Sequence, residues 1–206
     1  MMAIRSVAVF DLGGVLIDWN PRYLYRKLFD GDEKAIEHFL ATVCTPSWNA
    51  QQDAGRTFAD ACASLRSVHP RQAGLIDAWF ERYDEMLAGP VLGSVDVFRE
   101  LRAHGIPLYA LSNWSVETFP VALKRFDFLQ WFRGVLLSGQ VGLLKPDPSF
   151  FQLFLETFAI DPAHAVYIDD LKPNVEAAAA FGMHGILFTD PAALRVELVS
   201  VGLIPG

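Results

Sequence analysis

The chain has 206 residues, 52% of them hydrophobic and 20% charged, which suits a globular protein with one core domain and an insertion. Its formal net charge is −7, and the sequence contains no block of consecutive lysine or arginine residues. This argues against sequence-independent binding to DNA or RNA, because such binding depends on neutralising phosphates. No stretch approaches about 18 uninterrupted apolar residues, and the N-terminus has no hydrophobic region of signal-peptide length, so we expect no membrane association. The two cysteines, Cys44 and Cys62, do not require an oxidising compartment, so we expect a cytoplasmic location.

The first predicted element is a short apolar strand that ends at an aspartate. Residues 7–10 (Val-Ala-Val-Phe) are followed by Asp11 and then by Gly13 and Gly14. The carboxyl end of a strand is where an open α/β sheet presents its chemistry. An aspartate there can act as a nucleophile toward a phosphoryl group or an activated carbon, and the glycines let the backbone approach a ligand closely. The alternative is a strand and a tight turn with no catalytic role.

A long segment with helical periodicity follows this strand, and from Pro90 onward predicted helices alternate with predicted strands. Apolar residues recur at helical spacing over residues 23–29, 34–40, 58–65 and 75–87, and we interpret the whole of 19–88 as helical. Beyond it, helices are predicted over 94–104, 116–126, 150–158 and 173–181. Strands are predicted over 107–111, 135–137, 165–168 and 185–188.

This order of elements predicts the α/β fold class. Helices that alternate with strands build a doubly wound parallel, Rossmann-like sheet whose strand ends converge on one edge. The long helical segment predicts a cap inserted into that core, with Gly89-Pro90 as the return linker. We therefore expect a core over residues 1–18 and 89–206 and a helical cap, with the role of a lid, over 19–88.

Polar residues follow three further apolar runs that we interpret as strands. They are Ser112 and Asn113 after 108–111, Lys145 after 141–144, and Asp169 and Asp170 after 166–168. Singly, these residues also suit a helix cap, a solvated loop and a turn. Together with Asp11 they form the set that phosphoryl transfer needs: a carboxylate that attacks phosphorus, and a hydroxyl and an ammonium that hold the phosphate oxygens.

The acidic residues predict a Mg²⁺ site. Asp11 and Asp170 supply carboxylate oxygens, and a backbone carbonyl near Gly13 supplies another, which are the ligands that Mg²⁺ prefers. Asp169 would bind the cation through water or serve as the second carboxylate. Lys145 can also pair with Asp11 and keep it ionised. The sequence thus predicts Mg²⁺ as cofactor and a small phosphorylated substrate.

At these residues the chain resembles the haloacid dehalogenase-like hydrolase superfamily over essentially its whole length. The resemblance is carried by residues 10–16 (Phe-Asp-Leu-Gly-Gly-Val-Leu), 111–113 (Leu-Ser-Asn), 145–147 (Lys-Pro-Asp), and 168–170 (Ile-Asp-Asp) with Asn174. The helical segment is similar to the C1 cap of that superfamily. The resemblance implies a covalent aspartyl intermediate on Asp11, and phosphate contacts from Ser112, Asn113 and Lys145. It also implies Mg²⁺ at Asp11, the Gly13 carbonyl and Asp170.

The first motif departs from the pattern of most phosphatases in the superfamily. These carry a second aspartate two residues after the nucleophile, which protonates the leaving group and then activates water, whereas this chain has Gly13 there. A subgroup similar to α-D-glucose-1-phosphate phosphatase shares the Asp-Leu-Gly pattern, and we take it as the nearest. It favours a sugar phosphate as substrate. We also expect a preference for good leaving groups unless another residue donates the proton, with Asp18 and Asp53 as the next candidates.

Two other functions stay open at this point. A 2-haloacid dehalogenase would use Asp11 to attack carbon and displace halide without metal. The adjacent pair Asp169-Asp170 favours a phosphatase, because two carboxylates facing Asp11 repel one another unless a cation lies among them. The third reading is a phosphate-sensing or partner-binding protein with little turnover.

Trp114 and two residues of the helical segment are weaker candidates. Trp114, beside Ser112 and Asn113, is placed either to line the substrate pocket or to pack at the start of a helix. Asp53 and Arg56 reach the cleft only if their loop faces the core.

Overall fold

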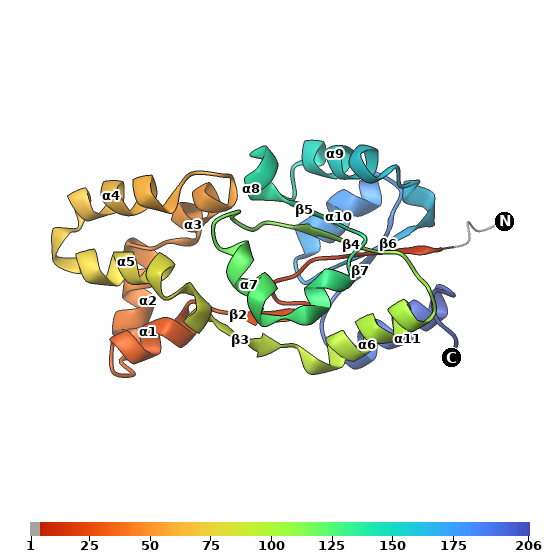
Figure 1. Cartoon of the computed structure of the whole chain (residues 1–206), viewed down its shortest axis with the longest axis horizontal. Helices are drawn as coiled ribbons and strands as arrows, with labels where there is room; N and C mark the ends of the chain where they lie inside the picture. Colours follow the sequence, from red (N-terminus) through yellow and green to blue (C-terminus); the bar gives the residue numbers. More distant parts are fainter. Residues whose placement is uncertain (1–4) are drawn as a thin grey trace.

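The computed structural model describes residues 5–206 and contains one five-stranded parallel sheet, shown in Figure 1. The first four residues of the predicted core therefore lie outside the described residues. The strand order is β5-β4-β1-β6-β7, so β1, which carries Asp11 at its end, lies at the centre. The strands are β1 (Val7–Phe10), β4 (Leu108–Ser112), β5 (Gly134–Leu137), β6 (Ala165–Asp169) and β7 (His184–Leu187).

Helices cover both faces of this sheet. They are α6 (Leu92–Ala103), α7 (Phe119–Arg125), α9 (Pro148–Phe158), α10 (Lys172–Ala180) and α11 (Pro191–Ser200), with the single-turn α8 (Ser138–Val141) after β5. In Figure 1, α9 and α10 lie on one side of the strands, while α6 and α11 lie together on the other. This arrangement confirms the predicted fold class.

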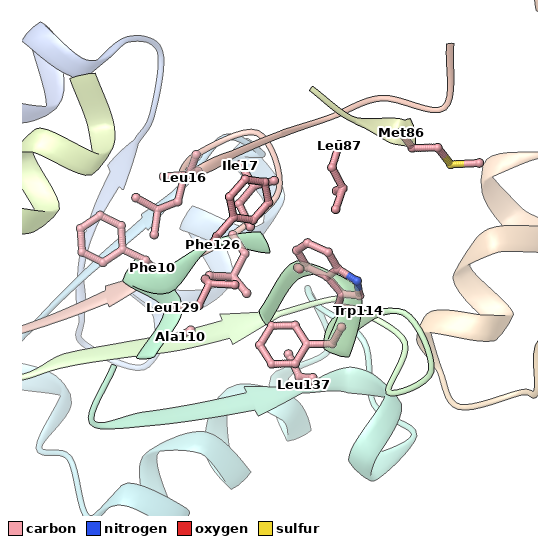
Figure 2. Packing of buried hydrophobic residues seen from close by; sticks show 14 of the residues in the cluster. Phe10, Leu16, Ile17, Met86, Leu87, Ala110, Trp114, Phe126, Leu129 and Leu137 are labelled. Atoms are coloured by element: carbon pink, nitrogen blue, oxygen red, sulfur yellow. The ribbon is translucent and has the colours of Figure 1, made fainter. Parts of the chain in front are cut away.

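The side chains of β1 alternate between two apolar clusters, as expected for a central strand. Phe10 belongs to the larger cluster, and its ring packs edge-on to that of Phe98 on α6 at a centroid distance of 5.2 Å. Val9 belongs to the cluster formed with α9 and α10. Figure 2 shows Phe10 and Trp114 within the larger cluster. Both faces of β1 are thus buried, which fixes the position of the Asp11 that follows it.

Five helices lie between two short strands that the sequence analysis missed. The helices are α1 (Arg22–Leu28), α2 (Glu33–Thr42), α3 (Pro46–Asp53), α4 (Phe58–Val68) and α5 (Ala73–Glu81). The strands are β2 (Ile17–Trp19) and β3 (Leu87–Pro90), which pair antiparallel. We call the segment from α1 to α5 the helical insertion. Its extent agrees with the helical periodicity, while the exact boundaries of core and cap stay a prediction.

The β2–β3 pair corrects the interpretation of residues 75–90. The predicted helix over 75–87 ends at Glu81 in α5, and a 3₁₀ turn (Tyr83–Met86) leads into β3. Gly89 and Pro90 are not a free linker, because they pair with Asp18 and Ile17 of β2. Strands of three and four residues carry too little periodicity to be recognised, and their pairing joins distant parts of the chain.

Lys145 does not follow a strand, contrary to the prediction. Residues 138–141 form α8, which ends at Gly142 with a φ of 72°, and Lys145 lies in the loop beyond. A short apolar run cannot be assigned to strand or loop by periodicity alone, which explains the error. None of the helices in residues 5–206 is long and apolar enough to cross a membrane.

Candidate active site

Asp11 lies at the carboxyl end of β1 with one carboxylate oxygen held by the protein. Its Oδ1 accepts hydrogen bonds from the backbone N–H of Leu12 at 2.7 Å and from the Ser112 hydroxyl at 2.8 Å. The Lys145 ammonium is 2.9 Å from the same oxygen. All three donors contact Oδ1, and within residues 5–206 no side chain or backbone N–H donates a hydrogen bond to Oδ2. Ser112 is the last residue of β4, so two parallel strand ends form this contact.

The Lys145 ammonium joins two buried carboxylates. Its side chain is 1% exposed and lies 2.9 Å from Asp11 Oδ1 and 2.7 Å from Asp169 Oδ2. Burial acts to lower the pKa of Lys145, but the two carboxylates hold that pKa above its ordinary value. Burial likewise raises the pKa of Asp11, against the opposing effect of Lys145. Lys145 is therefore a permanent positive charge in this cluster.

Asn113 positions the Lys145 backbone. Its side-chain amide donates to the Lys145 carbonyl at 3.0 Å, and its side-chain oxygen accepts from the Lys145 N–H at 2.8 Å. This pair of bonds replaces the strand that the sequence analysis assumed before Lys145. The end of β4 thereby fixes a loop that comes from elsewhere in the chain.

Asp169 is fully buried and its oxygens are occupied by protein donors. Oδ1 accepts from the Leu171 N–H at 2.8 Å and from Asn174 Nδ2 at 2.9 Å. Oδ2 accepts from Lys145 Nζ at 2.7 Å and from the Tyr167 hydroxyl at 2.6 Å. Because these contacts fix Asp169, its carboxylate holds the Lys145 ammonium in place.

Asp170 is exposed beside the buried pair. Partial burial, together with the negative charges of Asp11 and Asp169, raises the pKa of Asp170 to about 6. Gly14 allows this close approach: its φ is 75°, and a Cβ atom built there would lie 2.5 Å from Asp170 Oδ2. Only glycine fits both conditions.

The three carboxylates suit a hard divalent cation. Asp11, Asp169 and Asp170 each offer one oxygen, and these oxygens lie within 4.8 Å of one another. Their negative charges exceed the single charge of Lys145 and raise the pKa of Asp170, so a bound cation would relieve the repulsion. An all-oxygen ligand set is the type that Mg²⁺ prefers.

A cavity of about 350 Å³ opens at this cluster. The cavity is lined by all the residues that the sequence predicts for the site except Asp169, which is fully buried and contacts Lys145. Trp114 forms part of the wall, with its indole N–H donating to Thr118 Oγ1 at 3.1 Å. Gly13 also lines the cavity, and a Cβ atom built there meets no described atom within 4 Å.

The helical insertion and the segments that flank it add cavity residues that sequence reasoning missed. Asn49 of α3 lines the same cavity, as do Trp19 of β2 and Tyr83 of the 3₁₀ turn, and nothing in their local sequence distinguishes them from packing residues. Asp53 also lines the cavity, so of the two residues that the sequence left open, Asp53 does reach the cleft. Arg56 instead donates to the Gln51 side chain at 2.9 Å on the surface.

Asp18 is engaged elsewhere. The Tyr23 hydroxyl lies 2.9 Å from both of its carboxylate oxygens, and Asp18 is not among the described residues that line the cavity. Of the two candidates for the missing acid, the structure therefore brings only Asp53 to the site.

Sequence comparison identifies the family. Residues 6–182 match the sequence model of a protein family that is described as haloacid dehalogenase-like hydrolase. The chain belongs to this hydrolase family. The sesquiterpene phosphatase astK of Aspergillus oryzae is 29% identical over 96% of this chain and 97% of its own length. The drimenol cyclase drtB of Aspergillus calidoustus is 26% identical over 94% of this chain, which spans 36% of that protein.

Solved structures confirm the fold of this hydrolase. A HAD family enzyme of Bacteroides thetaiotaomicron, solved in complex with magnesium and inorganic phosphate, has a TM-score of 0.69 at 23% identity. The match covers 90% of this chain and 95% of the other. The protein is thus an enzyme of the haloacid dehalogenase-like family with a phosphatase among its relatives. The C1-cap subgroup and the nearness to α-D-glucose-1-phosphate phosphatase stay predictions.

Proposed function

We propose that this hydrolase is a Mg²⁺-dependent phosphatase that forms a phospho-aspartyl intermediate on Asp11. The observation that supports it best is the contact of Lys145 with Asp11 and Asp169 beside the exposed carboxylate of Asp170. In this proposal Asp11 is the nucleophile, Lys145 is the fixed positive charge, and the carboxylates form the cation site at one end of the sheet. Phosphoryl transfer requires these three features together.

Asp11 is the nucleophile in this proposal. Ser112 and Lys145 hold Oδ1 at 2.8 and 2.9 Å, so that Oδ2 faces the phosphorus atom and attacks it in line. The same hydroxyl and ammonium, with the neighbouring Asn113, then contact the oxygens of the transferred group. Fixed donors of this kind need little reorganisation as charge develops on those oxygens.

Asp11 and Asp170, with the Gly13 carbonyl, are the residues that we propose as Mg²⁺ ligands. When bound, the cation neutralises charge between the attacking carboxylate and the phosphate. Asp169 contributes through water or by holding Lys145, since its oxygens already accept protein hydrogen bonds.

The substrate that we propose is a small phosphorylated metabolite, with a sugar phosphate as the favoured class. The cavity of about 350 Å³ combines aromatic walls, Trp19 and Trp114, with the polar Asn49. Such a mixture suits a compact group that carries both hydroxyls and an apolar face.

A substrate screen with and without metal tests this function. Phosphate esters and 2-haloacids are each assayed with Mg²⁺ and with EDTA. We expect phosphate release that requires Mg²⁺, because the phosphate and Asp11 are both anionic. Halide release that resists the chelator would instead establish the dehalogenase. Binding of phosphate without turnover of any ester would establish the binding protein.

A further inference from the structure

The cavity contains a carboxyl group that the proposed mechanism does not use. Asp53 is the last residue of α3 in the helical insertion and lines the same cavity as Asp11 and Lys145. The resemblance described in the sequence analysis implies a proton donor two residues after the nucleophile, and this chain has Gly13 there, which has no side chain to donate a proton. Asp53 is therefore a carboxyl group in the right cavity without an assigned role.

The backbone of Asp53 is fastened to the sheet side of the cavity. The Ser138 hydroxyl donates to the Asp53 carbonyl at 2.5 Å and accepts from the Trp114 N–H at 2.9 Å. Next to it, Gly55 has a φ of 98°, and a Cβ atom there would lie 3.2 Å from the Gly139 carbonyl. The insertion thus approaches α8 closely at this point. This contact joins the backbone of Asp53 to Ser138 and, through Ser138, to Trp114.

The Asp53 side chain is partly ordered by its own helix. Asn49, one turn earlier on α3, donates from Nδ2 to Asp53 Oδ2 at 2.8 Å. Burial raises the pKa of Asp53 to about 7, and the Ser115 backbone amide acts in the opposite direction. The titratable group that faces it is Tyr83, whose pKa is raised by burial and by Asp53. A carboxyl group in these surroundings exchanges its proton near neutral pH.

The other polar groups of the site are committed to different tasks. Lys145 and Asp169 are paired with each other, and Asp170 belongs to the proposed cation site. We propose that Asp53 donates the proton to the departing oxygen of the substrate, as a catalytic residue supplied by the helical insertion. This inference rests on the phosphatase function proposed above.

The two half-reactions balance with Asp53 in this role. Asp11 Oδ2 forms a bond to phosphorus while the bond from phosphorus to the ester oxygen breaks. The departing oxygen keeps the electron pair and takes the proton of Asp53, which becomes a carboxylate. That carboxylate then accepts a proton from the water that attacks the phosphorus of phospho-Asp11. Inorganic phosphate and the Asp11 carboxylate are released, and Asp53 is again protonated.

The test compares leaving groups in Asp53→Asn and wild type. Alkyl phosphates need a proton on the departing oxygen, whereas dinitrophenyl phosphate does not. We expect Asp53→Asn to lower kcat/KM, which reports the steps up to departure of the leaving group, about 10²- to 10⁴-fold for alkyl phosphates, and to change kcat/KM for dinitrophenyl phosphate by less than about threefold. The matched control is Asp18→Asn, which removes a half-buried carboxyl group outside the cavity lining and should leave both rates unchanged.

Each outcome decides the proposal. An equal loss of kcat/KM on all esters indicates a structural role for Asp53 and overturns it, as does an unchanged kcat/KM on alkyl phosphates. If Asp53→Asn does not fold, the wild type still tests it: a shallow dependence of kcat/KM on leaving-group pKa supports it, and a steep one contradicts it. A wild type that hydrolyses no ester, dinitrophenyl phosphate included, contradicts the proposed function itself.

Discussion

Replacing Lys145 with methionine tests how far the site depends on its buried charge. The Lys145 side chain is 1% exposed and contacts Asp11 at 2.9 Å and Asp169 at 2.7 Å. Methionine keeps most of the volume and removes the ammonium. Two buried carboxylates then face each other without the positive charge between them.

The structure sets the size of the expected effect. Removing one partner of a buried ion pair costs about 3–5 kcal/mol, because the remaining charge is buried without compensation. For a chain of this size each kcal/mol lowers Tm by about 2–4 °C, so we expect a decrease of about 6–20 °C. Phosphatase activity should also be lost, since Lys145 orients Asp11.

Chemical denaturation of Lys145→Met and of a control measures this effect. The control is Lys27→Met, whose ammonium is 2.7 Å from Glu85 Oε2 but whose side chain is 58% exposed. An exposed pair contributes less than about 1 kcal/mol, so Lys27→Met should unfold like the wild type. If Lys145→Met also unfolds within about 1 kcal/mol of the wild type, the charge cluster does not hold the site together in the way we describe.

Three further predictions concern the glycines and Asp53. Gly14→Ala should raise the Mg²⁺ concentration for half-maximal activity at least tenfold, because its Cβ would lie 2.5 Å from Asp170 Oδ2; a metal titration that matches wild type contradicts this. In urea, the ionisation of Asp53 should cost the wild type stability as the pH rises from about 4 to 7, because the folded pKa of Asp53, about 7, exceeds the ordinary value of 3.8 and folding therefore favours the protonated form. Asp53→Asn should lose less, and equal slopes would show that Asp53 does not titrate in this range. Gly13→Asp should restore alkyl phosphate hydrolysis to Asp53→Asn, since Gly13 lines the cavity and a Cβ there meets no described atom within 4 Å. A folded double variant without restored activity on alkyl phosphates argues against this placement.

Part of the site follows from the sequence because parallel strands end on one edge. Asp11 and Ser112 follow or end neighbouring strands of the sheet, and Asp169 ends the strand on the other side. Periodicity is enough to predict those strands, and their order brings the residues together. Lys145 was predicted for the site on a wrong assumption, because it comes from a loop that Asn113 holds in place.

The insertion side of the cavity could not be predicted in the same way. Which face of α3 meets the cavity depends on how that helix packs against the core, and the contact of Ser138 with Asp53 joins residues far apart in sequence. Trp19 and Tyr83 lie at a short strand and a 3₁₀ turn that periodicity does not resolve. Partners chosen by tertiary packing leave no local pattern in the chain.

Direct detection of phospho-Asp11 tests the central claim. The enzyme is mixed with Mg²⁺ and dinitrophenyl phosphate, quenched in acid within the first turnover, digested and examined by mass spectrometry. We expect the peptide that contains Asp11 to gain one phosphoryl group, and Asp11→Asn to show neither this peptide nor turnover. Phosphate release by the wild type without a modified Asp11 peptide, or an Asp11→Asn variant with more than about a tenth of wild-type activity, would contradict covalent catalysis at this residue.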